Sequence, residues 1–439
     1  EIQGLAVGGV KGGWLFMEAY LAGIYKNRIY LRTDRLNWLV YNHIKRALYS
    51  VVNRNKQDSI VLDISNIRRI YPNGIVPVIC EVNRLKRLGA NFQLIPPQDE
   101  DTRKYCEALG WLHFLAPEEY PLNEKNRYQN FALHRFKNVD ELNEVINGAL
   151  DICLKHLIFE SGVPQAFEWT INEIAGNVLV HAGIEEGFLQ VLVDRVHNKL
   201  NFIVCDFGVG IPYNIKKAFP DIKSDKIAIE HAIKKGVTSN PKHGQGNGLA
   251  GSVAIAIASN SNLFITSKAG RVQVMDGRVK SERQFPPFEG TCVEMQFNTQ
   301  VTIDLPRTLW GNKPVSYFET RYENDLGDLM FKLKDHSKNF GNRPTGERLR
   351  TLVYNLLLQN PGHSVVIDME DIPLIASSFA DELFGKLAAD LGILDFSRLI
   401  KITNVNAVCK EIIDVAIKQR IVQNYGAHYV TLVDDIQQA

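Results

Sequence analysis

Strand and helix patterns alternate along the first quarter of the chain. The apolar runs at 29–33 (IYLRT), 59–65 (SIVLDIS) and 91–97 (NFQLIPP) each predict a strand, because they are short and bounded by polar residues or proline. The segments 39–52 and 75–89 repeat apolar residues at helical spacing, so each predicts an amphipathic helix. This alternation predicts a small sheet backed by helices.

The same alternation returns at the end of the chain, where three apolar runs are separated by amphipathic ones. The predicted strands are 301–306 (VTIDLP), 363–370 (HSVVIDME) and 399–405 (LIKITNV), and the predicted helices are 345–360, 377–392 and 406–420. The chain therefore carries a similar α/β pattern at each end.

The middle of the chain combines helices with buried strands. Residues 139–159 predict a helix with acidic residues in its first turn, and Pro164 separates it from a second helix. We expect an α/β protein with four stretches. They are a leader of uncertain structure (1–27), a first α/β domain (28–120), a central domain (121–299) and a last α/β domain (300–439).

Composition and charge narrow the function classes. Fifty Lys and Arg residues balance 49 Asp and Glu residues, so the formal net charge is +1 and no nucleic acid or anionic membrane is expected as a partner. The apolar leader contains charges and glycines that argue against a membrane span. The six cysteines include no CxxC pair, which is typical of reduced thiols in a cytoplasmic protein.

Two short motifs mark the first half of the central domain. Glu173 and Asn177 are four residues apart, so they share one face of an otherwise apolar helix. The apolar run before Asp206 predicts a buried strand, and Gly208 and Gly210 follow it. Glycine at these positions lets the backbone approach a ligand closely.

Two further motifs follow in the second half. A glycine-rich turn (GQGNGL) leads directly into an apolar helix, whose first N–H groups could hold an anion. Its named positions are Gly244, Gly246, Gly248 and Leu249. Gly290 and Thr291 precede an alternating strand. Each motif alone has an ordinary interpretation, such as a surface pair, a turn or a flexible loop, but those interpretations do not explain four motifs in one order.

This order resembles the ATP-binding domain of the histidine-kinase-like (GHKL) ATPases. The resemblance implies a sheet covered by helices on one face, with ATP and Mg²⁺ held between the helices and a lid at residues 211–243. It implies that Asn177 binds Mg²⁺, that Glu173 orients or deprotonates the attacking water, and that Asp206 accepts a hydrogen bond from the adenine amino group. The glycines would approach the base and the phosphates, with Leu249 beside them, and Thr291 would support the adenine pocket.

The two terminal domains resemble STAS domains, the anti-sigma-factor antagonist modules. In that family a strand that ends in Asp is followed by a turn bearing a phosphorylatable serine. Asp63 fits the strand end of the first copy, but no serine occupies its turn. The last copy has Ser377 and Ser378 there, as candidate phosphoacceptors, although Ala376 and Phe379 depart from the family pattern. Ser378 is also explained as a helix N-cap.

Three functions remain open at this stage. The first is an Mg²⁺-dependent ATPase or a serine kinase that acts on a STAS-like domain. The second is a non-catalytic switch, in which ATP changes the surfaces offered to protein partners. The third, a DNA-acting machine, lacks the expected basic surface. The sequence leaves open whether the chain forms a homo-oligomer.

Overall fold

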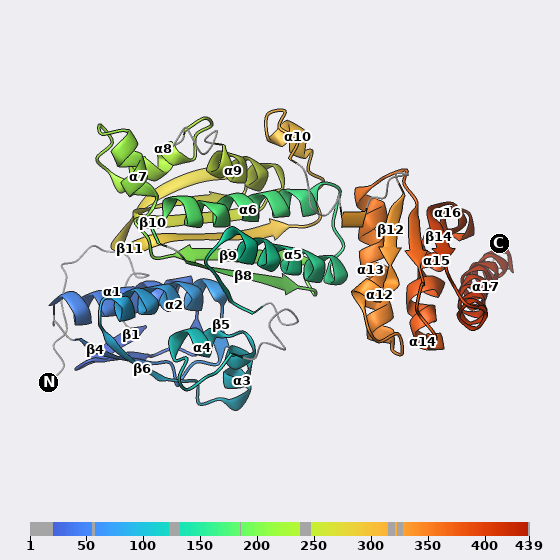
Figure 1. The fold of residues 1–439 in the computed structure, drawn as a ribbon, viewed down its shortest axis with the longest axis horizontal. Helices are drawn as coiled ribbons and strands as arrows, with labels where there is room; N and C mark the ends of the chain where they lie inside the picture. Colours follow the sequence, from blue (N-terminus) through green and yellow to red (C-terminus); the bar gives the residue numbers. More distant parts are fainter. Residues whose placement is uncertain are drawn as a thin grey trace.

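The computed structural model describes residues 21–54, 58–122, 132–184, 186–237, 247–314, 321–322 and 328–437. Helices and strands alternate around three main sheets, which confirms the predicted α/β class. Figure 1 shows the four-stranded sheet below the five-stranded sheet, with helices between them, and the three-stranded sheet to one side. Among the described residues, no helix is both long and apolar enough to cross a membrane.

The N-terminal part (residues 21–122) contains a four-stranded sheet in the order β1-β2-β4-β6. Its strands are β1 (Ala22–Tyr25), β2 (Arg28–Leu31), β4 (Ser59–Asp63) and β6 (Asn91–Ile95), and a separate short pair joins β3 (Arg35–Leu36) to β5 (Arg69–Ile70). Its helices are α1 (Trp38–Tyr49), α2 (Pro72–Arg87), α3 (Glu100–Ala108) and α4 (Trp111–Leu115). The three predicted strands and two predicted helices are all present. Asn37 starts α1, because its side chain accepts a hydrogen bond from the Val40 N–H.

The central part (residues 132–314) contains a five-stranded sheet in the order β10-β11-β9-β8-β7, with every neighbouring pair antiparallel. Its strands are β7 (His134–Phe136), β8 (Gly187–Asp194), β9 (Lys199–Asp206), β10 (Asn262–Met275) and β11 (Arg278–Asn298). Its helices are α5 (Val139–His156), α6 (Val163–His181), α7 (Ile211–Ala218), α8 (Asp225–Ala232), α9 (Gly248–Ala258) and α10 (Leu305–Thr308).

Helices cover both faces of this sheet (Figure 1). On one face, α5, α6 and α9 share a core with it, and Ile171, Ile174 and Val178 of α6 are buried there. On the other face, α2 packs on β8, β9 and β11. Phe188, Ile203 and Cys205 join a second core with the N-terminal helices. The N-terminal part therefore buries a sheet face that would otherwise expose apolar residues to water.

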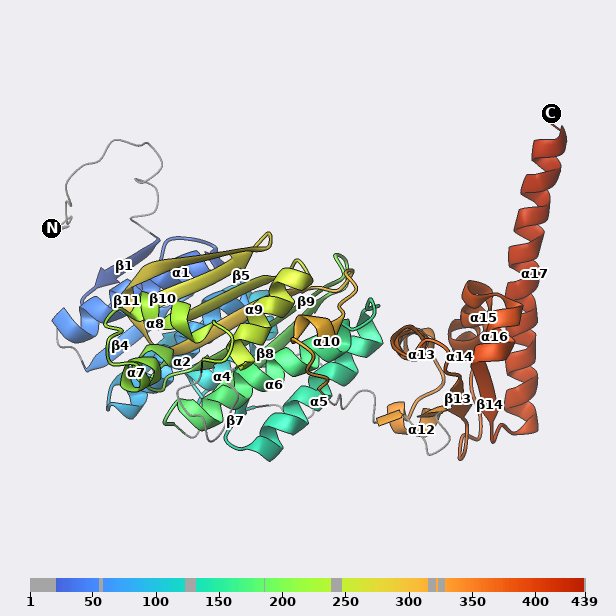
Figure 2. The same ribbon diagram turned by 90° about the horizontal axis from the view of Figure 1, so that it is seen from above.

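The C-terminal part (residues 328–437) contains a parallel sheet in the order β12-β13-β14. Its strands are β12 (Leu329–Lys332), β13 (Val365–Asp368) and β14 (Ile400–Thr403). Its helices are α12 (Leu333–His336), α13 (Arg343–Gln359), α14 (Ser377–Ala380), α15 (Lys386–Leu391), α16 (Ile393–Leu399) and α17 (Ala407–Gln437), and a π-helical stretch (Asp381–Gly385) joins α14 to α15. Figure 2 shows α17 extending beyond the sheet.

The predicted strand at 301–306 is wrong. Asp304 instead caps α10, because its carboxylate accepts a hydrogen bond from the Arg307 N–H at 3.1 Å. Pro306 is also favourable in the first turn of a helix. The first strand of the C-terminal sheet is β12, a four-residue strand that the sequence pattern did not indicate.

Candidate functional site

Most of the candidate residues line one cavity of about 520 Å³. It lies between α6, α9 and the end of strand β9 in the central sheet. The predicted residues in its lining are Glu173, Asn177, Asp206, Gly210, Gly248, Leu249 and Thr291. Gly208 is not among the lining residues, and Gly244 and Gly246 lie outside the described residues. The fold therefore brings all four sequence motifs to one place.

Glu173 joins the first motif to the third. Its carboxylate lies against the first residue of α9, because a Cβ added at Gly248 would be 2.3 Å from Glu173 Oε2. Glycine at 248 thus makes room for the carboxylate. Burial raises the pKa of Glu173 above its ordinary value, since a buried site disfavours the charged form.

Asp206 and Thr291 join the second motif to the fourth. They are opposite each other on the antiparallel strands β9 and β11, and Asp206 is 3% exposed. The Gly208 N–H donates to Asp206 Oδ1 at 2.8 Å. Burial raises the pKa of Asp206 to about 6, so the carboxyl is mostly ionised at pH 7.

Ser267 holds together the corner of the cavity that is formed by Asp206, Gly290 and Thr291, although it belongs to none of the four sequence motifs. Its Oγ donates to the Gly290 carbonyl oxygen at 2.6 Å, lies 3.1 Å from Thr291 Oγ1 and accepts from the Ile211 N–H at 3.0 Å. Ser267 is on β10, directly opposite Thr291 on β11. This pairing is the signal that could have identified it, once the strand register is known.

Glycine is required at two positions in this corner, where the backbone comes very close to neighbouring atoms. Gly210 has a φ of +80°, and an added Cβ would be 2.7 Å from Ser267 Oγ. Gly290 has a φ of +129°, and an added Cβ would be 2.1 Å from the Asp206 carbonyl oxygen. Both positions combine left-handed backbone with a close approach, so a side chain would displace the strands that position Asp206.

Besides the residues predicted for the site, the lining contains the polar or aromatic residues Trp169, Asn172, His181, Asn214 and Asn312. Asn214 Nδ2 donates to the His181 carbonyl oxygen at 2.9 Å, which ties α7 to the end of α6. Trp169 lies one turn before Glu173 on the same helix, so helical periodicity could have found it. Asn312 comes from the segment after the sheet and could not have been found in this way.

The predicted lid lies only partly within the described residues. Its helices α7 and α8 pack on each other through Ile215, Ala228 and Ala232. The Gly236 N–H donates to Asn247 Oδ1 at 3.2 Å, and Asn247 is the residue before α9. Residues 238–246 lie outside the described residues.

Ser377 and Ser378 do not contribute to the cavity. They are the first two residues of α14, which Figure 1 places in the C-terminal part, apart from α6 and α9. The predicted N-cap role of Ser378 is wrong, because Ala376 precedes the helix and its carbonyl oxygen accepts from the Phe379 and Ala380 N–H groups. Ser377 is exposed and Ser378 is partly exposed.

The acidic residues beside these serines are paired. Arg420 donates to Asp381 at 2.6 and 2.7 Å, and Arg343 Nη1 lies 3.1 Å from both Asp381 and Glu382. The repulsion that two unpaired carboxylates would exert on a phosphate is therefore partly neutralised.

Metal-binding side chains do not cluster in the described part of the chain: no three His, Cys, Asp or Glu residues there could hold a metal ion together. All six cysteines are buried and free.

Comparison with known proteins identifies one part of the chain. A family model described as a STAS-like domain of unknown function (DUF4325) matches residues 345–408, which run from α13 to the start of α17. The predicted STAS resemblance is thus confirmed for the C-terminal part. No curated protein matches the chain.

Proposed function

We propose that the cavity binds Mg·ATP as histidine-kinase-like ATPases do, and that ATP hydrolysis or serine phosphorylation there is coupled to the STAS-like part. The observation that supports this most is the meeting of residues from four separate motifs around one cavity of about 520 Å³. This volume falls within the usual range for small-molecule sites.

The Asp206 corner would bind the adenine ring. An ionised carboxylate only accepts hydrogen bonds, so it matches the amino group of adenine and opposes the carbonyl oxygen that guanine has at the same position. Asp206 is held for this task by the Gly208 N–H and by its pairing with Thr291.

The start of α9 would bind the phosphates. The first N–H groups of this 11-residue helix have no partner within the helix, and no side chain caps them. Such a helix start favours anions. Asn177 would hold Mg²⁺ through its side-chain oxygen, which suits a hard cation.

Glu173 would act as the general base. Its carboxylate lies beside the first residue of α9, where the terminal phosphate would be held. Its raised pKa makes it a better proton acceptor than an exposed glutamate. It would take the proton of the attacking hydroxyl, which belongs either to water or to a serine such as Ser377 or Ser378.

A second candidate is a non-catalytic switch, in which ATP binding alone changes the surfaces offered to protein partners. The STAS-like match favours it, because a STAS-like part fits a partner-switching regulator. The two candidates differ in whether phosphate leaves ATP.

Incubation of the protein with Mg²⁺ and γ-labelled ATP tests both candidates. An ATPase releases free phosphate, a kinase labels a protein, and a switch binds ATP without either product. Glu173→Ala should keep binding and lose turnover, whereas Glu119→Ala, which removes an exposed carboxylate, should behave as wild type.

Two further variants test the site itself. Asn177→Ala should lose Mg²⁺-dependent ATP binding, and Asp206→Asn should weaken binding of adenine nucleotides. Equal binding by wild type and Asn177→Ala would refute the assignment. If the protein itself is labelled, changing Ser377 and Ser378 together to Ala should remove the label.

A further inference from the structure

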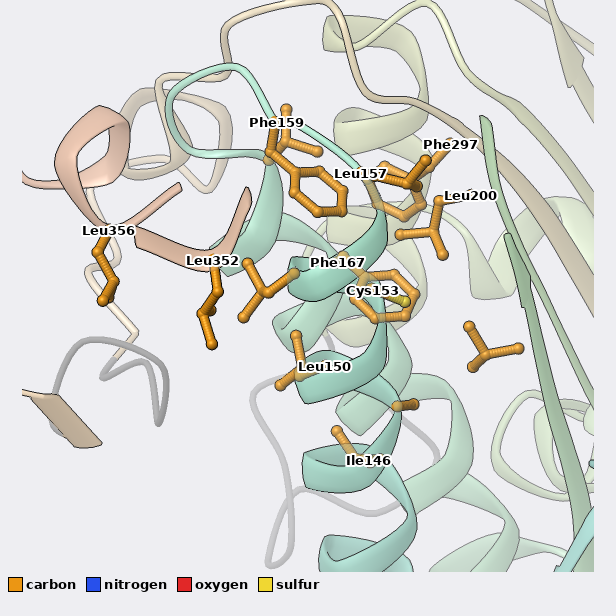
Figure 3. Packing of buried hydrophobic residues seen from close by; sticks show 14 of the residues in the cluster. Ile146, Leu150, Cys153, Leu157, Phe159, Phe167, Leu200, Phe297, Leu352 and Leu356 are labelled. Carbon is orange, nitrogen blue, oxygen red and sulfur yellow. The ribbon is translucent and has the colours of Figure 1, made fainter. Parts of the chain in front are cut away.

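The contact between α13 of the STAS-like part and α5 of the central part has an apolar and a polar half. Figure 3 shows Leu352 and Leu356 of α13 facing the helix that carries Ile146 and Leu150. All four side chains belong to one buried core. The polar half lies on the same helix α13 and consists of two amide side chains one turn apart, Asn355 and Gln359.

Asn355 is fully buried and makes three hydrogen bonds to the backbone of the central part. Its Nδ2 donates to the carbonyl oxygens of Leu154 and Leu157 at 2.8 and 2.7 Å, and its Oδ1 accepts from the Phe159 N–H at 3.0 Å. Leu154 and Leu157 are at the end of α5, where carbonyl groups lack partners within the helix. Asn355 thus caps a helix of another part of the chain.

Gln359 bonds the backbone of the loop that follows α5. Its Oε1 accepts from the Gly162 N–H at 2.9 Å, and its Nε2 donates to the carbonyl oxygens of Phe159 and Glu160 at 3.1 and 3.2 Å. Together the two amides make six hydrogen bonds to residues 154–162. All six are to backbone atoms.

The bound loop leads directly into α6. Gly162 precedes the first residue of that helix with a φ of +78°, and an added Cβ there would be 2.0 Å from the Ile303 carbonyl oxygen. The Ile303 N–H donates to the Ser161 carbonyl oxygen at 2.9 Å. The start of α6 is therefore fixed from two sides, and α6 carries Glu173 and Asn177.

We propose that α13 is the docking element of the STAS-like part, and that Asn355 and Gln359 are positioning residues that set the start of α6. The partner that this surface fits is the end of one helix and the loop that leads into the next. The consequence for the cavity rests on the proposed function. A change in the STAS-like part would reach the nucleotide site through these two amides.

Hydrogen exchange in the full chain tests the docking without any nucleotide. Gln359→Ala should speed the exchange of amides in residues 159–168 by about tenfold, because the Gly162 N–H loses its acceptor and the loop at 159–162 loses three hydrogen bonds that fix it. Asn360→Ala is the matched control, since Asn360 is the residue after the same helix and its side chain donates to the Leu356 carbonyl oxygen of that helix, at 2.9 Å. Wild-type exchange at 159–168 in Gln359→Ala would overturn the proposal.

Nucleotide kinetics test the coupling. Gln359→Ala should lower kcat by about tenfold with little change in KM, because a displaced Glu173 affects the reaction more than binding. Gln359→Met keeps the length of the side chain without its hydrogen bonds and should behave as Gln359→Ala does, so it replaces Gln359→Ala if that variant fails to fold. Faster exchange with wild-type kcat would refute the coupling. If the wild type lacks ATP turnover, the proposed function fails, and the exchange experiment alone decides the docking.

Discussion

The N-terminal and C-terminal parts share an order of elements but dock on the central part with different helices. In each part a helix precedes a strand that ends in Asp, and another helix follows it. The N-terminal part packs chiefly the later helix, α2, on the central sheet. The C-terminal part packs the earlier helix, α13, on α5.

The chemistry of the two contacts also differs. The N-terminal contact is mainly apolar and joins Cys80 and Val82 of α2 to Phe188 and Ile203 of the sheet in one core. The C-terminal contact combines apolar packing with two amides that bond backbone atoms.

This difference decides whether the turn after the Asp-ending strand is exposed to a partner in each part. The turn at the start of α2 is occupied, since Asn73 Nδ2 donates to Glu294 Oε1 of the central sheet at 3.1 Å. The corresponding start of α14 carries Ser377 and Ser378, and Ser377 is exposed. A regulator could therefore reach this turn in the C-terminal part without undocking it, but not in the N-terminal part.

Removal of a buried aromatic side chain from the N-terminal contact should have the largest effect on stability. Phe188 is fully buried, and its ring lies edge-on to Phe114 with centroids 5.4 Å apart. Phe188→Ala should lower the free energy of unfolding by about 3–5 kcal/mol, because it leaves a cavity in the core. Chemical denaturation measures the change.

The control for this variant is Leu88→Ala, next to the end of α2, where the side chain is 72% exposed. It should change stability by less than about 0.5 kcal/mol. A loss below about 1 kcal/mol for Phe188→Ala would mean that the apolar contact is not a structural core.

The next largest effect should appear in the pH dependence of stability. Neighbours along a strand face opposite sides, so Cys205 faces the N-terminal contact while Asp206 faces the cavity. The pKa of Asp206 is raised from 3.8 to about 6 in the folded state. Stability from this carboxyl is therefore fully present below pH 3.8 and is lost as the pH rises through 6, by on the order of 3 kcal/mol.

Asp206→Asn should remove this loss. The stability difference between wild type and variant should therefore change between pH 4 and pH 7, which denaturation at both values measures. The C-terminal contact provides the contrast, because Asn355 and Gln359 do not titrate. The difference between wild type and Gln359→Ala should stay constant over the same range, and a constant difference for Asp206→Asn would contradict the raised pKa.

Local patterns predicted the elements, while contacts between distant segments escaped them. Helical periodicity identified α1, α2 and α13, because each buries one face and exposes the other, and short apolar runs identified largely buried strands such as β9 and β13. It failed at 301–306, where the Asp304 cap and Pro306 favour a short helix over a strand.

The candidate site divides in the same way. Glu173, Asn177, Asp206 and Thr291 were predicted because each belongs to a short motif, and the structure places all four in one cavity lining. Ser267 was missed because only strand pairing brings it opposite Thr291, and Asn312 was missed because only the return of the chain after β11 brings it to the lining. Gln359 likewise looked like an ordinary helix residue until its partners were known.

A carboxylate introduced at the start of α2 should lower the free energy of unfolding by less than the preceding changes, but by a measurable amount. Asn73→Asp replaces the amide that donates to Glu294 by a second carboxylate, and burial already raises the pKa of Glu294. The variant should lose about 1–3 kcal/mol at pH 7, because a donor is replaced by a like charge. Repulsion raises both pKa values, so the lost stability should return on acidification. A loss that is equal at pH 4 and pH 7 would contradict this account.

An aspartate introduced at the same helix position of the C-terminal part should have the smallest effect on the free energy of unfolding. Ser378 is the second residue of α14, as Asn73 is of α2. Figure 1 shows α14 apart from the central sheet, and a negative charge in the first helical turn is favourable. Asp381, three residues later in the chain, is already paired with Arg420 and Arg343. Ser378→Asp should therefore change the free energy of unfolding by less than about 0.5 kcal/mol. A loss as large as that of Asn73→Asp would mean that the start of α14 is not free, and the contrast between the two ends of the molecule would fail.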